Sequence, residues 1–321
     1  MKKLLIVLTI LLLSVSLSAS GEKESGTVIG ISKLMSHPAL DAVEQAVQDY
    51  FADKDYDVTF NLQNANGDIS TAASIAQQFK MEKIDIALGI ATPSAQALVN
   101  VFSDIPVVFS AITDPVSAGL LADDNGSPDS NVCGVSDSNP VKEQIKLLAE
   151  VTGAKVIGNV YSSNEANGIV LAETAEAACQ ELGLTYIGAA VSNSSEVKQA
   201  AQSIAPRVDA IYVATDNGVC SATSSIADVC TESNIGFLSA DPTSADGQDY
   251  LIAWGFDYYS LGIETAKTIE KIINGEEPGP IGTVFLTDPA AFQLWFNKGI
   301  ANKLGIEISQ DLLNTAAKVV E

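Results

Sequence analysis

Three segments of the chain follow one pattern, in which an apolar run ends in a short polar tripeptide and then continues into a helix-like segment. They are residues 84–99 (IDIALGIATPSAQALV), 105–121 (IPVVFSAITDPVSAGLL) and 209–229. Apolar, β-branched runs predict strands that are buried on both faces, as in parallel sheets covered by helices. In such sheets, ligands bind beyond the carboxyl ends of the strands, where helix N-termini present free N–H groups. The pattern therefore predicts an α/β protein that presents Ser, Thr, Asp and Asn side chains to a small polar ligand.

The alternation of strand and helix continues along most of the chain, in two successive series. The first covers residues 27–111, and the second begins near Pro140 and ends at Phe256. Regular alternation with short connections is typical of doubly wound parallel sheets. The 321 residues also exceed what one hydrophobic core usually spans. We therefore expect two doubly wound lobes.

Further elements follow the second series. We expect an amphipathic helix over residues 259–274, a strand over 281–286 and a helix around 290–305. A chain that crosses back between two lobes would leave a multi-strand hinge and a cleft that closes over a ligand. The expected division is an N-terminal lobe of residues 27–137 and 257–280 and a C-terminal lobe of residues 138–256 and 281–321.

Residues 1–20 have the form of a secretory signal, with Lys2 and Lys3, an apolar run from Leu4 to Leu13, and small residues before Gly21. The apolar run is shorter than the roughly 20 residues that span a bilayer, which favours processing over a retained membrane span. The segment LSAS resembles a bacterial lipobox, but Ser20 stands where the lipidated Cys would be. We expect an exported protein, periplasmic or at the cell surface, with residues 21–26 as a flexible tether. Attachment to the membrane is left open.

The net charge of −23 argues against nucleic acid or an anionic membrane surface as a partner, because either would need a basic surface. Arg207 is the one Arg in the sequence. Since Arg is the usual bidentate partner of carboxylates, a ligand carboxylate would instead be held by hydroxyl groups and helix N-termini.

The sequence does not favour an enzyme. His37 is the one His, and the chain has no G-x-S-x-G motif and no Gly-rich phosphate loop. We therefore expect no catalytic residue, no metal and no cofactor. A helix-capping or cleft-lining role fits His37 better than that of a general base.

The four cysteines have neither metal-site spacing nor a CxxC pair. Buried free thiols are the favoured interpretation, with a disulfide as the alternative. Cys220 and Cys230 fall on one predicted helix, roughly 15 Å apart, and should not pair with each other. The other two are Cys133 and Cys179.

Asp114, Asp216 and Asp241 each follow an apolar run. A single Asp at a strand end is often only a turn former or helix cap. Three in equivalent positions indicate one crevice, in which carboxylates suit an ammonium group and hydroxyls suit a carboxylate. Together they predict a site for a zwitterion. Thr92 precedes Pro93 and could act as a helix cap, which would make its hydroxyl less available.

Seven motifs resemble, in order and spacing, the ABC-transporter substrate-binding protein family associated with tryptophan and tyrosine uptake. The resemblance covers residues 28–278, and the motifs are GISKLMSHPALDA, QNANGDISTAASIAQQF, ATPSAQAL, IPVVFSAITDPVSAGL, NVCGVSD, TDNGVCSA and GFDYYSLGIETA. It implies a type I periplasmic-binding-protein fold with a three-segment hinge. It also implies an amino-acid ligand, with aromatic side chains the leading hypothesis, and an ABC permease as membrane partner. We expect the protein to be a monomer.

The resemblance also implies which residues bind the ligand. Asp216 would take the amino group, and Thr92 and Thr113, with nearby backbone N–H groups, would take the carboxylate. The full set is Thr92, Ser94, Ser110, Thr113 and Asp114 from the first lobe, Asn164, Glu165, Asp216 and Asn217 from the second, and Ser32 and Asp241 as secondary candidates.

Two alternatives stay open at this point. A sugar receptor of the same fold would use aromatic platforms and several Asp, Asn and Arg side chains, and this chain has a single Arg. A sensory module that feeds a signalling partner is not separated from transport by the sequence. A ligand-sensing repressor is excluded by the export signal and by the lack of an N-terminal pair of DNA-binding helices.

Overall fold

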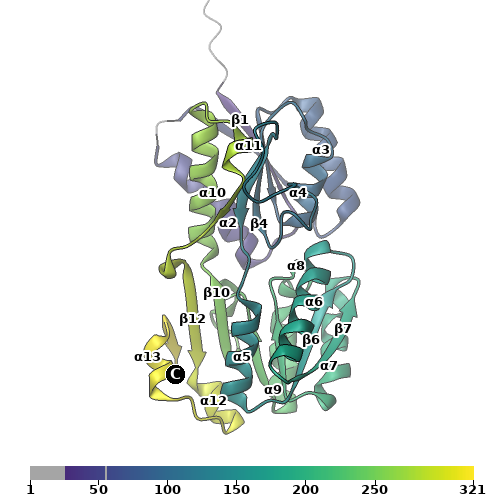
Figure 1. The fold of residues 1–321 in the computed structure, drawn as a ribbon, viewed down its shortest axis with the longest axis vertical. Coiled ribbons are helices and arrows are strands. Elements are labelled where there is room, and N and C mark those ends of the chain that lie inside the picture. The colour runs from purple at the N-terminus through teal and green to yellow at the C-terminus, as the bar shows by residue number, and fades with distance from the viewer. Residues whose placement is uncertain (1–25, 55) are drawn as a thin grey trace, which may run out of the picture.

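The computed structural model describes residues 26–54 and 56–321, so the expected signal segment and most of the expected tether lie outside the described residues. The chain forms two α/β lobes, one above the other in Figure 1, each built around its own sheet. None of the helices in the described ranges is long and apolar enough to cross a membrane.

The first lobe contains a six-stranded sheet in which every pairing is parallel. Its strands are β1 (Thr27–Lys33), β2 (Val58–Asn64), β3 (Ile86–Ile90), β4 (Val107–Ile112), β5 (Val132–Ser136) and β11 (Thr283–Phe285), in the order β11-β5-β4-β3-β1-β2. Its helices are α2 (Pro38–Ala52), α3 (Ile69–Glu82), α4 (Thr92–Val99), α10 (Tyr258–Ile273) and α11 (Pro278–Ile281). Helices α2 and α10 cover one face of the sheet and α3 and α4 the other (Figure 1).

The second lobe contains a seven-stranded sheet that is parallel except where β10 pairs with β12. Its strands are β6 (Val156–Ser162), β7 (Thr185–Val191), β8 (Ala210–Val213), β9 (Gly236–Ser239), β10 (Ile252–Phe256), β12 (Phe292–Asn297) and β13 (Lys318–Val320), in the order β13-β12-β10-β9-β8-β6-β7. Its α-helices are α5 (Val141–Thr152), α6 (Ala166–Glu181), α7 (Val197–Ile204), α8 (Asn217–Cys220), α9 (Thr223–Ser233), α12 (Lys298–Leu304) and α13 (Gln310–Thr315). Single 3₁₀ turns are η1 (Ser194–Glu196), η2 (Ala205–Arg207), η3 (Thr243–Ala245) and η4 (Pro289–Ala291).

The chain passes between the lobes three times, after β5, after β10 and after β11. This arrangement confirms the expected doubly wound lobes on a three-segment hinge. The expected boundary after residue 280 is wrong, because Thr283 of β11 pairs with Gly134 of β5 in the first sheet. The last crossing therefore follows Phe285.

Three local predictions were wrong. Residues 292–297 form strand β12 rather than the start of a helix, because their aromatic side chains pair against β10. Residues 132–136, which fall between the two predicted series, form the buried strand β5, which was not predicted. Residues 113–121 form turns rather than a helix-like segment, because the Asp114 carboxylate accepts a hydrogen bond from the Ser117 N–H at 2.8 Å and closes a turn there.

Close packing fixes where α4 begins relative to β3. A Cβ atom at Gly89 would lie 2.6 Å from the Ala95 Cα, so only glycine lets the strand and the helix approach this closely. The first turn of α4 is thereby held at the carboxyl end of β3.

Candidate functional site

In both sheets the carboxyl ends of the strands face the junction between the lobes, except those of β12 and β13, which run opposite to β10. Helix α4 of the first lobe contacts α6 of the second, and α2 contacts η3. His37, directly before α2, lies against Asp241 and Asn217 of the second lobe. The loops that follow the strands of one lobe therefore meet those of the other.

Buried polar atoms without a hydrogen-bond partner gather at this junction. Among the described residues, seven buried side-chain atoms lack a partner, and six of them belong to five residues at or shortly after the carboxyl ends of strands. The five are Ser32, His37 and Ser94 from the first lobe and Asn167 and Thr215 from the second. Burying a polar group without a partner costs about 1–3 kcal/mol, so this concentration indicates a place that a polar ligand would complete.

The first lobe presents an uncapped helix start. The expected capping role of Thr92 is wrong: Thr92 is the first residue of α4, and the N-cap position is Ala91, which has no capping side chain. Ala91 has φ 77° and ψ 154°, a region that is almost restricted to glycine. Ala111, near the carboxyl end of β4 at an irregularity in its pairing with β5, has φ 57°. Strained backbone of this kind clusters at ligand sites.

Asp216 is 1% exposed and is bound within its own lobe. Its carboxylate accepts hydrogen bonds from the Ser162 N–H and hydroxyl, both at 2.6 Å, and from the Val219 N–H at 3.1 Å, which caps α8. Burial raises the pKa of Asp216. The carboxylate therefore holds β6 and α8 together at the edge of the site.

Glu165 is 4% exposed at the start of α6. Its two oxygens accept hydrogen bonds from the Asn217 amide at 2.6 Å and the Gly218 N–H at 3.0 Å. Burial, and then the neighbouring Asp216 charge, raise the pKa of Glu165 to about 7. A group that titrates at neutral pH thus lies next to a second buried carboxyl group.

Two further buried acids lie at the junction. The Asp241 carboxylate accepts hydrogen bonds from the Thr243 N–H at 2.9 Å and from Ser244, and burial raises its pKa. Burial also raises the pKa of Asp137, after β5, to about 6. Burial lowers the pKa of His37, while the Asp241 charge acts against that shift.

The structure shows which candidate residues are buried at the junction, which are hydrogen-bonded away from it and which are exposed. Ser32, Thr92, Ser94, Glu165, Asp216, Asn217 and Asp241 are all buried at the junction. The Ser110 hydroxyl is already bonded to the Thr265 hydroxyl at 2.7 Å, and the Asp114 carboxylate to Ser117. Asn164 is exposed.

Thr113 lies at the margin of the site. Its hydroxyl is 3.5 Å from an Asp137 carboxylate oxygen, and the residue lines a cavity of about 360 Å³. The cavity is bounded by residues of both lobes, including Asp124 of the first lobe and Asn139 and Val170 of the second.

Sequence reasoning missed Asp137, Asn167 and Thr215. Asp137 follows β5, which was not predicted as a strand, so its position at a strand end was hidden. Asn167 and Thr215 adjoin the predicted Glu165 and Asp216, and their adjacency to those residues was the available signal.

The part of the chain that the structure describes contains no group of three or more His, Cys, Asp and Glu residues arranged to hold a metal. The four cysteines are free and buried, as predicted. Cys220 ends α8 and Cys230 lies in α9, so their placement on one helix was wrong.

Two doubly wound lobes on three crossings, with unpaired polar groups buried where they meet, define a binding protein of the type I periplasmic-binding-protein fold. Solved solute-binding proteins of much lower identity share this fold. The chain belongs to the ABC transporter substrate-binding protein family, whose model matches residues 28–320. This membership confirms the predicted family and the prediction that the chain is a binding protein rather than an enzyme. Substrate-binding proteins of ABC transporters work outside the cytoplasm, in agreement with the expected export.

Three relatives are similar over most of the chain. The tyrosine-binding protein of Clostridioides difficile (strain R20291) is 32% identical over 265 residues, which cover 81% of this chain and 76% of the relative. An ABC domain from Streptococcus pneumonia, solved in complex with L-Trp, is 32% identical with a TM-score of 0.86, covering 92% of this chain and 100% of that one. A ligand-free, open substrate-binding protein with adhesive properties from Clostridium difficile is 31% identical with a TM-score of 0.68, covering 92% of this chain and 99% of that one.

Proposed function

We propose that this protein binds an amino acid with an aromatic side chain, such as tryptophan, tyrosine or phenylalanine, between its lobes and delivers it to an ABC permease. The observation that carries the proposal is the meeting of unpaired buried polar atoms from both lobes around carboxyl groups. The relatives described as tyrosine-binding and as a complex with L-Trp support the ligand class.

The two lobes offer opposite chemistry. The first lobe presents the uncapped start of α4 with Thr92 and Ser94, which suits a carboxylate. The second lobe presents Glu165 and Asp216, which suit an ammonium group. A zwitterion that contacts both would favour the closed arrangement over the open one, because it gains its full set of partners only when the lobes meet. Ser32, Asn217 and Asp241 are secondary contacts, and Thr113 lies at the margin.

Hinge closure has support from the two solved relatives. Their identity to this chain is almost equal, at 32% and 31%, but the TM-score is 0.86 for the complex and 0.68 for the open, ligand-free protein. A lobe arrangement in this chain closer to that of the complex would account for the contrast, and this supports closure of the lobes over the ligand.

Isothermal titration calorimetry of the chain without residues 1–20, refolded to remove any carried ligand, tests the proposal. The titrants are tryptophan, tyrosine, phenylalanine, leucine and ribose. We expect dissociation constants in the micromolar range or tighter, roughly −8 kcal/mol, for at least one aromatic amino acid. If ribose alone gave heat, the proposed amino-acid ligand would be wrong and a sugar receptor would be the remaining interpretation.

A further inference from the structure

Glu165 and Asp216 form a pair of buried carboxyl groups in the second lobe. Both approach Gly218: a Cβ atom there would lie 3.2 Å from the Glu165 Oε1 and 3.7 Å from the Asp216 Oδ1. The two side chains come from different elements, the start of α6 and the start of α8. The fold therefore brings two acids together at the point where the lobes meet.

No Lys or Arg within the described ranges makes a salt bridge with either acid. Lys33, the buried cation of the first lobe, is bonded to Asp41 at 2.6 Å and to Glu44 at 3.0 Å. Among the residues that the structure describes, the two acids therefore have no fixed counter-ion.

The other titratable groups around the pair supply no cation either. Burial, and then the charges of Asp241, Asp216 and Glu165, raise the pKa of the Cys220 thiol. His37 faces Asn217 and Asp241 from the first lobe. Burial lowers the pKa of His37, so its imidazole is neutral at pH 7. Helix α4, which packs against α6, has the sequence TPSAQALV and carries no titratable side chain.

Two like charges that are buried together without a cation are not both ionised, because each disfavours the charge of the other and neither is solvated. Protonation of one acid removes one of the two charges. A bound cation would instead balance one of them.

Unpaired acceptors beside the pair point to a ligand cation. The Asn167 Oδ1 and the Thr215 Oγ1 are buried without a hydrogen-bond partner, and the two residues are 6% and 7% exposed. An ammonium group has three N–H donors, and these two oxygens together with a carboxylate supply three acceptors.

We propose that one of the two acids, Glu165 or Asp216, stays protonated while the site is empty, and that the ammonium group of the ligand displaces this proton to solvent when it binds. This inference rests on the proposed amino-acid ligand. The pKa of Glu165, raised to about 7 by burial and by Asp216, places the exchange at neutral pH. The proton and the ammonium group of the ligand compete for the same carboxylate, so the affinity for the amino acid falls as the pH falls through 7.

Calorimetry at pH 7 in phosphate and in Tris measures the exchange, because the buffer takes up the released proton and its ionisation enthalpy is thereby subtracted from the observed heat. We expect a release of about 0.5 proton for each ligand bound, since a group with a pKa of about 7 is half protonated at that pH. Equal heats in both buffers, or proton uptake, would overturn the inference while leaving the proposed function intact. No heat from any amino acid would instead overturn the proposed function.

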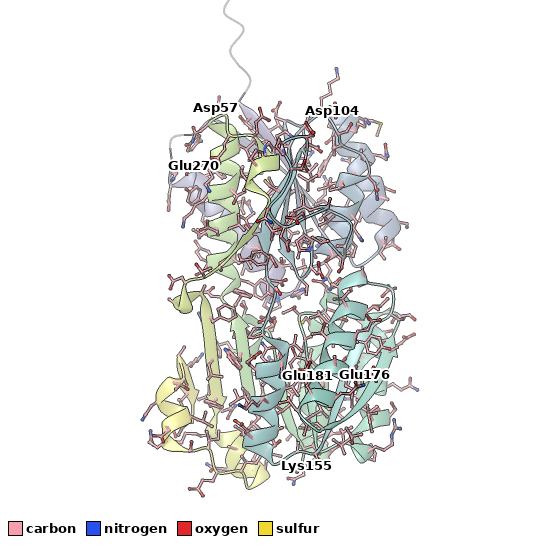
Figure 2. All side chains as sticks on the ribbon, in the orientation of Figure 1. Asp57, Asp104, Lys155, Glu176, Glu181 and Glu270 are labelled. Carbon is pink, nitrogen blue, oxygen red and sulfur yellow. The ribbon has the colours of Figure 1, made fainter. Side chains whose placement is uncertain are left out.

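Variants identify the source of the proton. Glu165→Gln keeps an oxygen for the Gly218 N–H and should abolish the buffer dependence. Glu176→Gln, on the exposed part of the same helix (Figure 2), is the matched control and should leave it unchanged. Release that persists in Glu165→Gln but disappears in His37→Gln would assign the proton to the imidazole and overturn the inference. The buffer dependence of the unmodified protein stands as a test even if Glu165→Gln fails to fold.

Discussion

The Tyr258 hydroxyl donates a hydrogen bond to the buried Asp137 carboxylate at 2.7 Å. Asp137 lies where the chain first leaves the first lobe, and Tyr258 lies where it returns to that lobe as α10. The contact therefore joins the first-lobe ends of two of the three crossings.

Tyr258→Phe should lower the free energy of unfolding at pH 7 by about 1–3 kcal/mol, because it leaves a buried carboxylate with one partner fewer. The pKa of Asp137 is raised by burial to about 6, and the Tyr258 bond holds it below a still higher value. At pH 5 the Asp137 carboxyl group is protonated in both proteins, so the loss should be smaller there. Urea denaturation at the two pH values measures the difference, and an equal loss at both would contradict this role.

Ser94→Ala should weaken ligand binding without destabilising the empty protein. The Ser94 hydroxyl is buried without a partner in the empty protein. Its removal therefore also removes the free-energy cost of burying an unpaired hydroxyl. Ser110→Ala is the matched control, because the Ser110 hydroxyl is bonded to Thr265 and its loss should cost about 0.5–1.5 kcal/mol of stability. Thermal unfolding and calorimetry of both variants compare the two serines. A stability loss in Ser94→Ala as large as that in Ser110→Ala would contradict the assignment.

Asp216→Asn should weaken amino-acid binding by about 10- to 100-fold, which corresponds to the loss of a charge-assisted hydrogen bond. The variant keeps an oxygen that can cap α8, so the fold should be retained. Asp216→Ala should weaken binding at least as much and also lose about 1 kcal/mol of stability, because it removes the cap and leaves the Ser162 N–H unpaired. Unchanged affinity in Asp216→Ala, measured by calorimetry, would show that Asp216 is not the ammonium partner.

The empty protein should become less stable as the pH rises from 4.5 to 7, in part because of Glu165. Its pKa rises from 4.5 to about 7 on folding, so in this range the native state binds more protons than the unfolded state. Stability then falls with pH by up to about 1.4 kcal/mol per unit for this group. Glu165→Gln should flatten the profile. The difference between the two urea-denaturation profiles isolates Glu165 from the other buried acids, and parallel profiles would refute the shift.

The four cysteines should not react with a thiol reagent until the protein unfolds. All four are buried and free, and burial raises the pKa of Cys133 to about 12 and that of Cys179 to about 11. Titration with dithionitrobenzoate should detect no thiol in the native protein and four in denaturant. Fewer than four in denaturant without reductant would indicate a disulfide.

Much of the fold could be predicted from local pattern. Buried strands such as β3 and β4 are short apolar runs, and helices such as α2 and α10 have apolar residues at helical spacing, so each element carries its own signal. Two of the predictions that failed depend on a distant partner. Phe292–Asn297 becomes a strand because β10 lies beside it, and β11 joins the first sheet because the edge of β5 is free to pair.

The candidate site was predicted in part for the same reason. Positions directly after predicted strands, such as Thr92 and Asp216, could be identified because parallel strands end at one edge of a sheet. Which of these side chains are already bonded could not be predicted, because their partners come from elsewhere in the chain. Ser110 is bonded to Thr265, 155 residues away, while Ser94 has no partner.

The sequence by itself determined that the chain forms two doubly wound lobes of an ABC transporter substrate-binding protein, because periodicity and motif order are local properties. Only the tertiary structure decided that Glu165 and Asp216 are buried near each other, with no Lys or Arg of the described ranges paired to either, and that His37 faces the second lobe. These relationships depend on solvation and on the distance between charges, and both arise only when segments far apart in the sequence pack together.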